Sequence, residues 1–177
     1  MLTTERLIVR PFRETDYLDL HEYLSLPEIY RFEPGGPVSL NEARKLASER
    51  ARGNDFWAVT LKDGNEKLIG HLSFIREEPK HFLTWEIGFI FNPAFQSKGY
   101  ATEASRAVID HAFQELNAHR VVGYCAVDNI ASRRVLEKCG LRKEGTMRRN
   151  AFFHEDENGQ PVWFDSHQYA LLAEEER

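Results

Sequence analysis

The middle of the chain, residues 82–127, constrains the fold more than any other segment. Apolar side chains alternate over residues 82–91 and the alternation stops at Asn92-Pro93, which ends a strand. A polar loop over 96–99 leads into a helix predicted over 100–116, and an apolar strand is predicted over 120–127. A strand, a helix and a strand at this spacing predict a βαβ unit, in which the two strands run parallel.

The flanking segments predict that this unit belongs to a single α/β domain. Ser39 and Glu42 form a capping box that starts a helix ending near residue 52, and an Asn-Gly pair marks the tip of a C-terminal hairpin. The expected elements are a strand over 7–12, helices over 15–25 and 39–52, an antiparallel meander over 57–61, 68–76 and 82–91, a helix over 131–138, and hairpin strands over 145–154 and 163–172. We see no repeat and no linker, so we expect one domain over residues 1–177.

Composition excludes several classes of protein. The 177 residues are 42% hydrophobic, enough for a real core, and the net charge of -5 gives no footprint for nucleic acid or an anionic membrane. The longest apolar runs are strand-sized and the polar start of the chain has no signal-peptide core, so we expect a cytoplasmic protein. The two cysteines and the histidines show no zinc or HExxH spacing, and we expect no metal.

The loop over residues 96–101 is the first candidate for chemistry. Backbone N–H groups and the positive end of the helix dipole would converge in front of Gly99, where a phosphate could approach the main chain closely. Taken alone, such a glycine also fits an ordinary tight turn. The sequence has neither a Walker A loop nor a GxGxxG fingerprint at this point.

Two segments resemble the acetyl-coenzyme A (acetyl-CoA) signature of the GNAT N-acetyltransferases: FNPAFQSKGYATEA over 91–104 and DNIASRRVLEKCGLRKEG over 128–145. Gln96, Gly99 and Ala101 match the family's phosphate loop. The second signature is matched by Asn129 at its start and by Gly140 and Leu141 at its end.

The opening TERLIVRPFRETD, the strand TWEIGFIFNP and the pairing of Asn129 with Ser132 are similar to the RimJ and RimL subgroup, the ribosomal-protein N-terminal acetyltransferases. This resemblance implies a GNAT-like mixed sheet, mostly antiparallel and twisted, with two splayed parallel strands, a C-terminal hairpin and helices on both faces. It implies acetyl-CoA as the acyl donor and no metal.

The resemblance also assigns contacts to the cofactor. Main-chain groups of Ile90 and Phe91 would pair with the pantetheine arm, and Asn129 and Ser132 would contact the end of that arm from the next helix. Backbone amides would hold the pyrophosphate, and they belong to Gln96, Ser97, Lys98, Gly99, Tyr100, Ala101 and Thr102.

For the reaction we expect an amine to attack the thioester directly in a ternary complex. Glu86, a carboxylate within an apolar strand, is the candidate base, although it could equally be solvated or paired with an arginine. Leu136 stands where the wider family often has a tyrosine that acts as the general acid. A leucine side chain has no proton to donate. Ser132 could instead hydrogen-bond the leaving thiolate, or it could satisfy the local helix backbone.

The acceptor is predicted to be a protein or peptide N-terminal α-amine, such as that of a ribosomal protein. Tyr30, Phe32 and the loop over 34–37 are the candidate acceptor wall, because loops often set specificity. The alternatives are a small amine, such as a polyamine, an amino acid, an amino sugar or an antibiotic, and a silent module that only binds coenzyme A. Monomer and homodimer both stay open.

Overall fold

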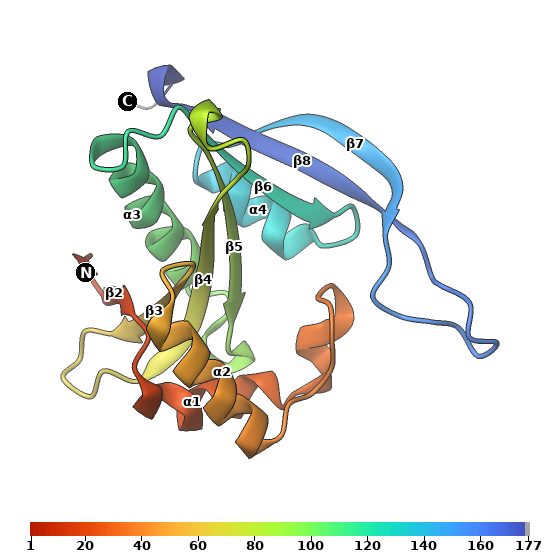
Figure 1. Cartoon of the computed structure of the whole chain (residues 1–177), viewed down its shortest axis with the longest axis horizontal. Helices are drawn as coiled ribbons and strands as arrows, with labels where there is room; N and C mark the ends of the chain where they lie inside the picture. Colours follow the sequence, from red (N-terminus) through yellow and green to blue (C-terminus); the bar gives the residue numbers. More distant parts are fainter. Residues whose placement is uncertain (176–177) are drawn as a thin grey trace.

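The computed structural model describes residues 1–175 and shows an α/β domain built on one eight-stranded sheet (Figure 1). The domain predicted over 1–177 therefore includes two residues, 176 and 177, that lie outside the described part. The strand order is β1-β2-β3-β4-β5-β6-β8-β7. The strands are β1 (Leu2–Thr3), β2 (Leu7–Pro11), β3 (Phe56–Leu61), β4 (Leu68–Arg76), β5 (Thr84–Phe91), β6 (Arg120–Ala126), β7 (Arg142–Ala151) and β8 (Phe164–Leu172).

Within residues 1–175, four α-helices and several 3₁₀ turns connect these strands. The capping box is present: Ser39 Oγ accepts the Glu42 N–H, and the Glu42 carboxylate accepts the Ser39 N–H, so α2 starts where the sequence predicts. The helices are α1 (Tyr17–Leu24), α2 (Leu40–Arg52), α3 (Tyr100–Gln114) and α4 (Ile130–Lys138). The 3₁₀ turns are η1 (Glu14–Asp16), η2 (Pro27–Arg31), η3 (Lys80–Phe82), η4 (Pro93–Phe95) and η5 (Ala173–Glu175).

The sheet is antiparallel except between β5 and β6. These two strands are parallel and α3 connects them, which confirms the predicted βαβ unit. The meander of β3, β4 and β5 is confirmed as well.

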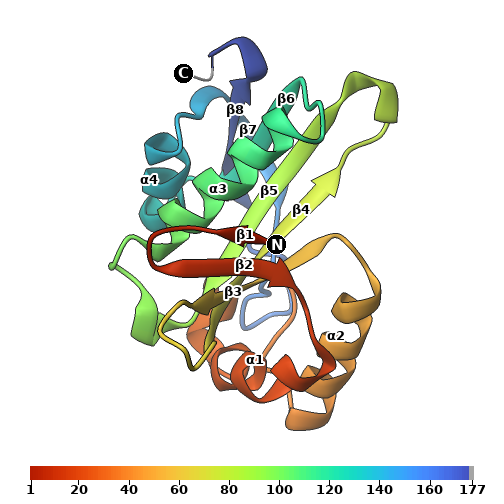
Figure 2. The same cartoon turned by 90° about the vertical axis from the view of Figure 1, so that its left-hand side faces the viewer.

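Helices cover both faces of the sheet, as expected. Val59 faces the core under α3 and α4, and its neighbour Ala58 faces the core under α1 and α2, because side chains alternate along a strand. Figure 2 shows α3 running alongside β5, with α1 and α2 grouped below β2 and β3. The first core packs against the start of α3, and the second includes residues of the segment after α1, so both segments are held in position by the core.

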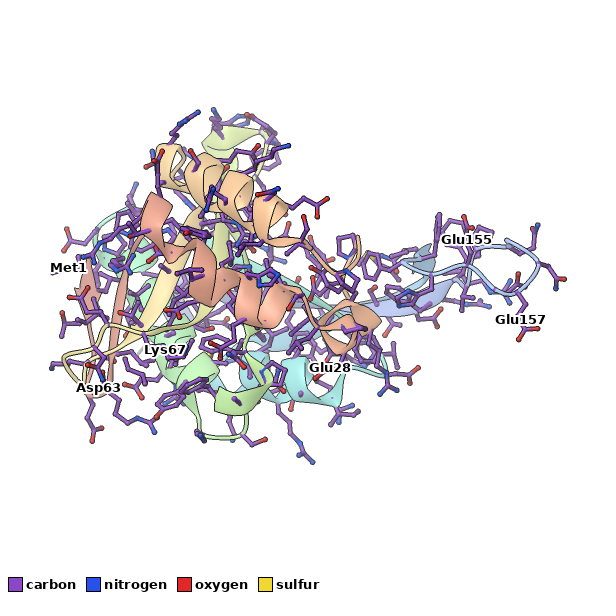
Figure 3. The ribbon with its side chains drawn as sticks, turned by 90° about the horizontal axis from the view of Figure 1, so that it is seen from below. Met1, Glu28, Asp63, Lys67, Glu155 and Glu157 are labelled. Carbon is purple, nitrogen blue, oxygen red and sulfur yellow. The ribbon has the colours of Figure 1, made fainter. Side chains whose placement is uncertain are left out.

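The C-terminal hairpin differs from the prediction in its bounds. The first strand, β7, runs three residues earlier than expected, because its pairing with β8 starts at Arg142 opposite Ala170. Residues 152–163 form a long arm that ends in the predicted tip: the Asp156 N–H donates to the Gln160 carbonyl at 2.8 Å, next to an isolated bridge from Glu155 to Pro161. Figure 3 shows Glu155 and Glu157 at the far end of this arm, away from Glu28.

Candidate active site

The site is built around the divergence of β5 and β6. The two strands pair only from Thr84, Trp85 and Glu86 to Arg120, Val121 and Val122. Beyond Glu86 they separate, as Figure 1 shows, so the rest of β5 has a strand partner only on its β4 side. The expected splayed parallel strands are therefore present, and they leave an edge of β5 that an extended ligand could pair with.

A cavity of about 580 Å³ occupies this divergence. Its walls come from η2 and the residues after it, the end of β5, the loop before α3, the first turn of α3, and α4. The sequence-predicted site residues that line it are Phe32, Ile90, Phe91, Gln96, Ser97, Gly99, Tyr100, Ala101, Thr102, Asn129 and Ser132. Segments that are far apart in the sequence thus meet at one cavity of ligand size.

The loop before α3 is held by its own side chains. Asn92 Oδ1 accepts the Ala94 N–H at 3.0 Å, which starts η4, and Gln96 Nε2 donates to the Phe91 carbonyl at 3.0 Å. Ser97 and Gly99 both have positive φ, 59° and 83°, so the chain turns sharply twice before the helix. Left-handed conformation is readily adopted by glycine, which explains Gly99 at the start of α3.

The first turn of α3 presents free backbone donors to the cavity. Gly99 caps the helix without a side-chain hydrogen bond, and the first helical bond runs from the Glu103 N–H to the Gly99 carbonyl. The amides of Tyr100, Ala101 and Thr102 therefore have no partner inside the helix, and the helix dipole adds positive potential at the same place. This arrangement suits a diphosphate.

Arg6, near the start of the chain, contacts both this loop and the first turn of α3. Arg6 Nε donates to Glu103 at 2.7 Å, and Arg6 Nη1 donates to the Lys98 carbonyl at 3.0 Å. The Arg6 guanidinium also lies 4.6 Å from the centre of the Tyr100 ring. Burial opposes ionisation of Glu103, yet hydrogen bonds from Thr4 and Arg6 hold its pKa below the usual value. Lys98 itself does not line the cavity; its ammonium contacts the Ala94 carbonyl.

On the α4 side, Asn129 and Ser132 meet at the start of the helix. The predicted pairing is a helix cap in which Asn129 Oδ1 accepts the Ser132 N–H at 3.1 Å. Within the described residues no hydrogen bond of the Ser132 hydroxyl is recorded, so this group is available to a ligand in the cavity.

Besides Lys98, two further predicted residues lie outside the cavity wall. Tyr30 is buried in the core under α1 and α2, and its hydroxyl donates to the Leu24 carbonyl at 2.8 Å. Glu86 is half-buried in the paired part of β5; burial, and then the charge of Glu77, raise its pKa. Its role as the base stays a prediction.

The structure adds wall residues that sequence reasoning did not single out. Glu28, Arg31 and Glu33 come from η2 and the two residues after it, and Arg134 and Lys138 come from α4. Burial alone raises the pKa of the Glu33 carboxyl to about 7. The only sequence feature that could have identified Glu33 as a wall residue is its position next to the Pro-Gly-Gly-Pro loop.

The described chain offers no site for a metal or for a membrane span. Over residues 1–175 no group of three or more His, Cys, Asp and Glu side chains could hold a metal ion. Nor does any helix in that range combine the length and apolar character that crossing a membrane requires. Both cysteines are buried, and burial raises the pKa of the Cys125 thiol to about 11.

Comparisons with known proteins agree with this geometry. Residues 6–142 match the model of the acetyltransferase (GNAT) domain. An uncharacterized N-acetyltransferase of Bacillus subtilis, YnaD, is 36% identical over 98% of this chain and 98% of its own. The crystal structure of a GNAT acetyltransferase from Bacillus anthracis superposes with a TM-score of 0.87, at 32% identity and 98% coverage of both chains.

A spermidine N-acetyltransferase from Vibrio cholerae, solved with CoA and spermine, shares the fold with a TM-score of 0.78 at 22% identity, covering 97% of this chain and 98% of its own. The loop, the free amides and the diverging strands fit the acyl donor of the matched family, acetyl-CoA. The chain therefore belongs to the GNAT family of acetyl-CoA-dependent N-acetyltransferases.

Proposed function

We propose that the protein transfers acetyl from acetyl-CoA directly to a primary amine while both substrates are bound. One observation carries this proposal. The uncapped first turn of α3 and the free edge of β5, which β6 leaves unpaired, lie at the same cavity. A diphosphate suits the first, and an extended arm that carries amides suits the second.

In this proposal the main chain of Ile90 and Phe91 pairs with the pantetheine arm. Amides from Gln96 to Thr102 hold the pyrophosphate, with Lys98 contributing only its main chain, because its side chain contacts Ala94. Asn129 and Ser132 contact the thioester end of the arm from α4. Holding donor and acceptor together supplies much of the rate enhancement in reactions of this type.

Ser132 is the proposed partner of the leaving thiolate. Ser132 lines the cavity, whereas Leu136, at the position of the family's tyrosine, is only 2% exposed and lies in the core. A thiol has a pKa of about 8.5, so the thiolate is a fair leaving group and a hydrogen bond supports its departure without a strong acid.

The first candidate acceptor is a peptide or protein N-terminal α-amine, in line with the RimJ and RimL resemblance and with a cytoplasmic location. Such an acceptor would enter between the segment over 30–37 and the C-terminal arm. One contact crosses this entrance: His154 Nε2 of the arm lies 3.0 Å from the Arg31 carbonyl. A peptide would have to pass beside that contact.

The second candidate is a small cationic amine. Two carboxylates, Glu28 and Glu33, line the cavity near η2, and either could pair with a cationic amine. The spermine complex of the Vibrio enzyme of the same fold gives a precedent for such an acceptor in that protein.

Thiol release from acetyl-CoA tests the proposal. We would assay the protein with peptides that have different N-terminal residues and with spermidine, amino acids and amino sugars, and identify the product by mass spectrometry. Acetylation of a peptide α-amine supports the first candidate, and acetylation of spermidine supports the second. Binding of coenzyme A without thiol release on any amine would contradict the proposal and leave a silent coenzyme A-binding module.

A further inference from the structure

Glu33 is a carboxylate on the cavity wall with no recorded role in holding the fold. It follows η2, and among residues 1–175 no hydrogen bond or ion pair of its side chain is recorded. Its side chain is half-buried. Burial without hydrogen bonds destabilises the charged form of a carboxylate, so a cationic ligand in the cavity would find Glu33 without a competing protein partner.

The segment that carries Glu33 is fixed at several points. The Tyr30 hydroxyl donates to the Leu24 carbonyl, and the Val38 N–H donates to the same carbonyl at 3.0 Å. His154 contacts the Arg31 carbonyl from the opposite side. These contacts hold both ends of the segment, so Glu33 is presented to the cavity by ordered backbone.

Across the same cavity lie the groups proposed to bind the thioester. Asn129 and Ser132 line it from α4, and Phe91 lines it from the end of β5. In Figure 1 the segment around η2 and the helix α4 lie on the side toward which β6 diverges from β5. An amine bound between Glu33 and these thioester-binding residues would therefore lie next to the acetyl group.

Burial alone raises the pKa of the Glu33 carboxyl to about 7. The other charged or titratable groups on the cavity wall are Glu28 and Arg31 near η2, Tyr100 at the start of α3, and Arg134 and Lys138 on α4. His154 contacts η2 from the arm. None of them forms a recorded ion pair with Glu33 within residues 1–175. A base with a pKa near the working pH is the most effective proton acceptor.

We propose that Glu33 accepts the proton that the acceptor amine must lose before it attacks acetyl-CoA. This inference rests on the proposed transfer to a primary amine. It assigns the role first predicted for Glu86 to a residue that lines the cavity.

An ammonium group binds beside the ionised Glu33, one Glu33 oxygen takes one proton, and the neutral amine attacks the thioester carbon. A C–N bond forms and the C–S bond breaks, and the departing thiolate takes the second proton of the nitrogen. Glu33 then releases its proton to solvent, and the products are the amide and coenzyme A.

The test is the pH dependence of kcat/KM for Glu33→Gln and for Glu86→Gln, with Glu115→Gln as the matched control. Glu115 is exposed at the end of α3 opposite Gly99. The acceptor is the peptide or spermidine that releases thiol with the wild-type protein. Acetyl-CoA affinity is measured by calorimetry for every variant.

We expect Glu33→Gln to bind acetyl-CoA normally and to lower kcat/KM at pH 7 by about 100-fold, within the usual range for loss of a general base. Without a proton acceptor the variant depends on amine that is already neutral. Its deficit should therefore shrink as pH rises toward the pKa of the amine, about 8 for a peptide N-terminus or about 10.4 for a lysine-like amine. A merely structural role would not give this rescue.

Three results would overturn the inference. In the first, Glu33→Gln keeps the wild-type pH profile. In the second, Glu86→Gln, and not Glu33→Gln, removes the fall of kcat/KM toward acidic pH. In the third, the wild-type protein releases no thiol with any amine, which would contradict the proposed function as well; the first two results leave that function standing.

Discussion

The Leu136 side chain fills the space that a side chain at Gly123 would need. A Cβ built on Gly123 would lie 2.7 Å from Leu136 Cδ2 and 3.5 Å from the Ile87 carbonyl oxygen. Leu136 therefore holds α4 against β6, close to where β5 and β6 separate, and its role is in packing. The residue at the position of the family's tyrosine has become part of the core.

Gly123→Ala should destabilise the fold by about 1–3 kcal/mol, the usual cost of overpacking a core. The Leu136 side chain is buried and cannot move freely aside. Urea unfolding of the wild-type protein and the variant measures this difference. The double variant Gly123→Ala with Leu136→Val should regain part of the loss, since the smaller side chain makes room. A Gly123→Ala variant as stable as the wild type would contradict the packing role.

Arg6→Ala should weaken acetyl-CoA binding, because the Arg6 side chain holds the Lys98 carbonyl and Glu103 behind the phosphate loop. We expect KM for acetyl-CoA to rise about fivefold to tenfold, the scale of one net hydrogen bond, with a smaller change in kcat. Steady-state kinetics at saturating acceptor gives both constants.

The matched control for Arg6 is Arg13→Ala, which removes an exposed ion pair with Glu66 far from the cavity wall. Exposed pairs contribute little, so this variant should behave as the wild type. Equal KM values for the two variants would show that Arg6 does not position the loop.

His71 should make the fold less stable at mildly acidic pH. Its Nδ1 lies 2.6 Å from the Tyr23 hydroxyl, both groups are buried, and burial, followed by the charge of Arg50, lowers the pKa of His71 well below its usual value. A lowered folded-state pKa means that this contribution is complete above about pH 6.5 and is lost as pH falls below it.

We expect the free energy of unfolding to fall by up to about 1.4 kcal/mol per pH unit below pH 6.5 through this group. Urea unfolding at pH 7.5, 6.5, 5.5 and 5.0 measures the slope. His71→Gln should reduce it, while the exposed His81→Gln should not. An unchanged slope in His71→Gln would mean that His71 is not the responsible group.

Local chemistry explains which parts of the fold could be predicted. The capping box of Ser39 and Glu42 and the break at Asn92-Pro93 act within a few residues, so sequence placed them well. The strand predicted from residue 82 begins at Thr84, because Leu83 takes a left-handed conformation, φ 52°, and its carbonyl accepts the His119 N–H. That contact joins distant segments, and no local pattern reveals it.

The hairpin and the acceptor wall show the same limit. The Asn-Gly signal placed the turn at the tip, but it did not show that β8 lies between β6 and β7 or that the arm over 152–163 extends past the sheet. Tyr30 faces the core, while Glu33, three residues on, faces the cavity, because η2 is anchored to α1. Long-range packing decides such orientations, so the loop before α3 was easier to predict than the segment after α1.

Binding of coenzyme A to Gly99→Ala, measured by calorimetry, tests the central claim most directly. Gly99 has a φ of 83°, and a Cβ there would stand 3.4 Å from Arg6 Nη2, beside the free amides. Gly64→Ala is the matched control, since Gly64 has a φ of 91° and open space around it, so both variants carry the same backbone strain. We predict that the wild-type protein and Gly64→Ala bind coenzyme A equally and that Gly99→Ala binds at least about tenfold more weakly while remaining folded. Equal binding by all three, or no binding by the wild-type protein, would contradict the claim that the start of α3 holds the diphosphate.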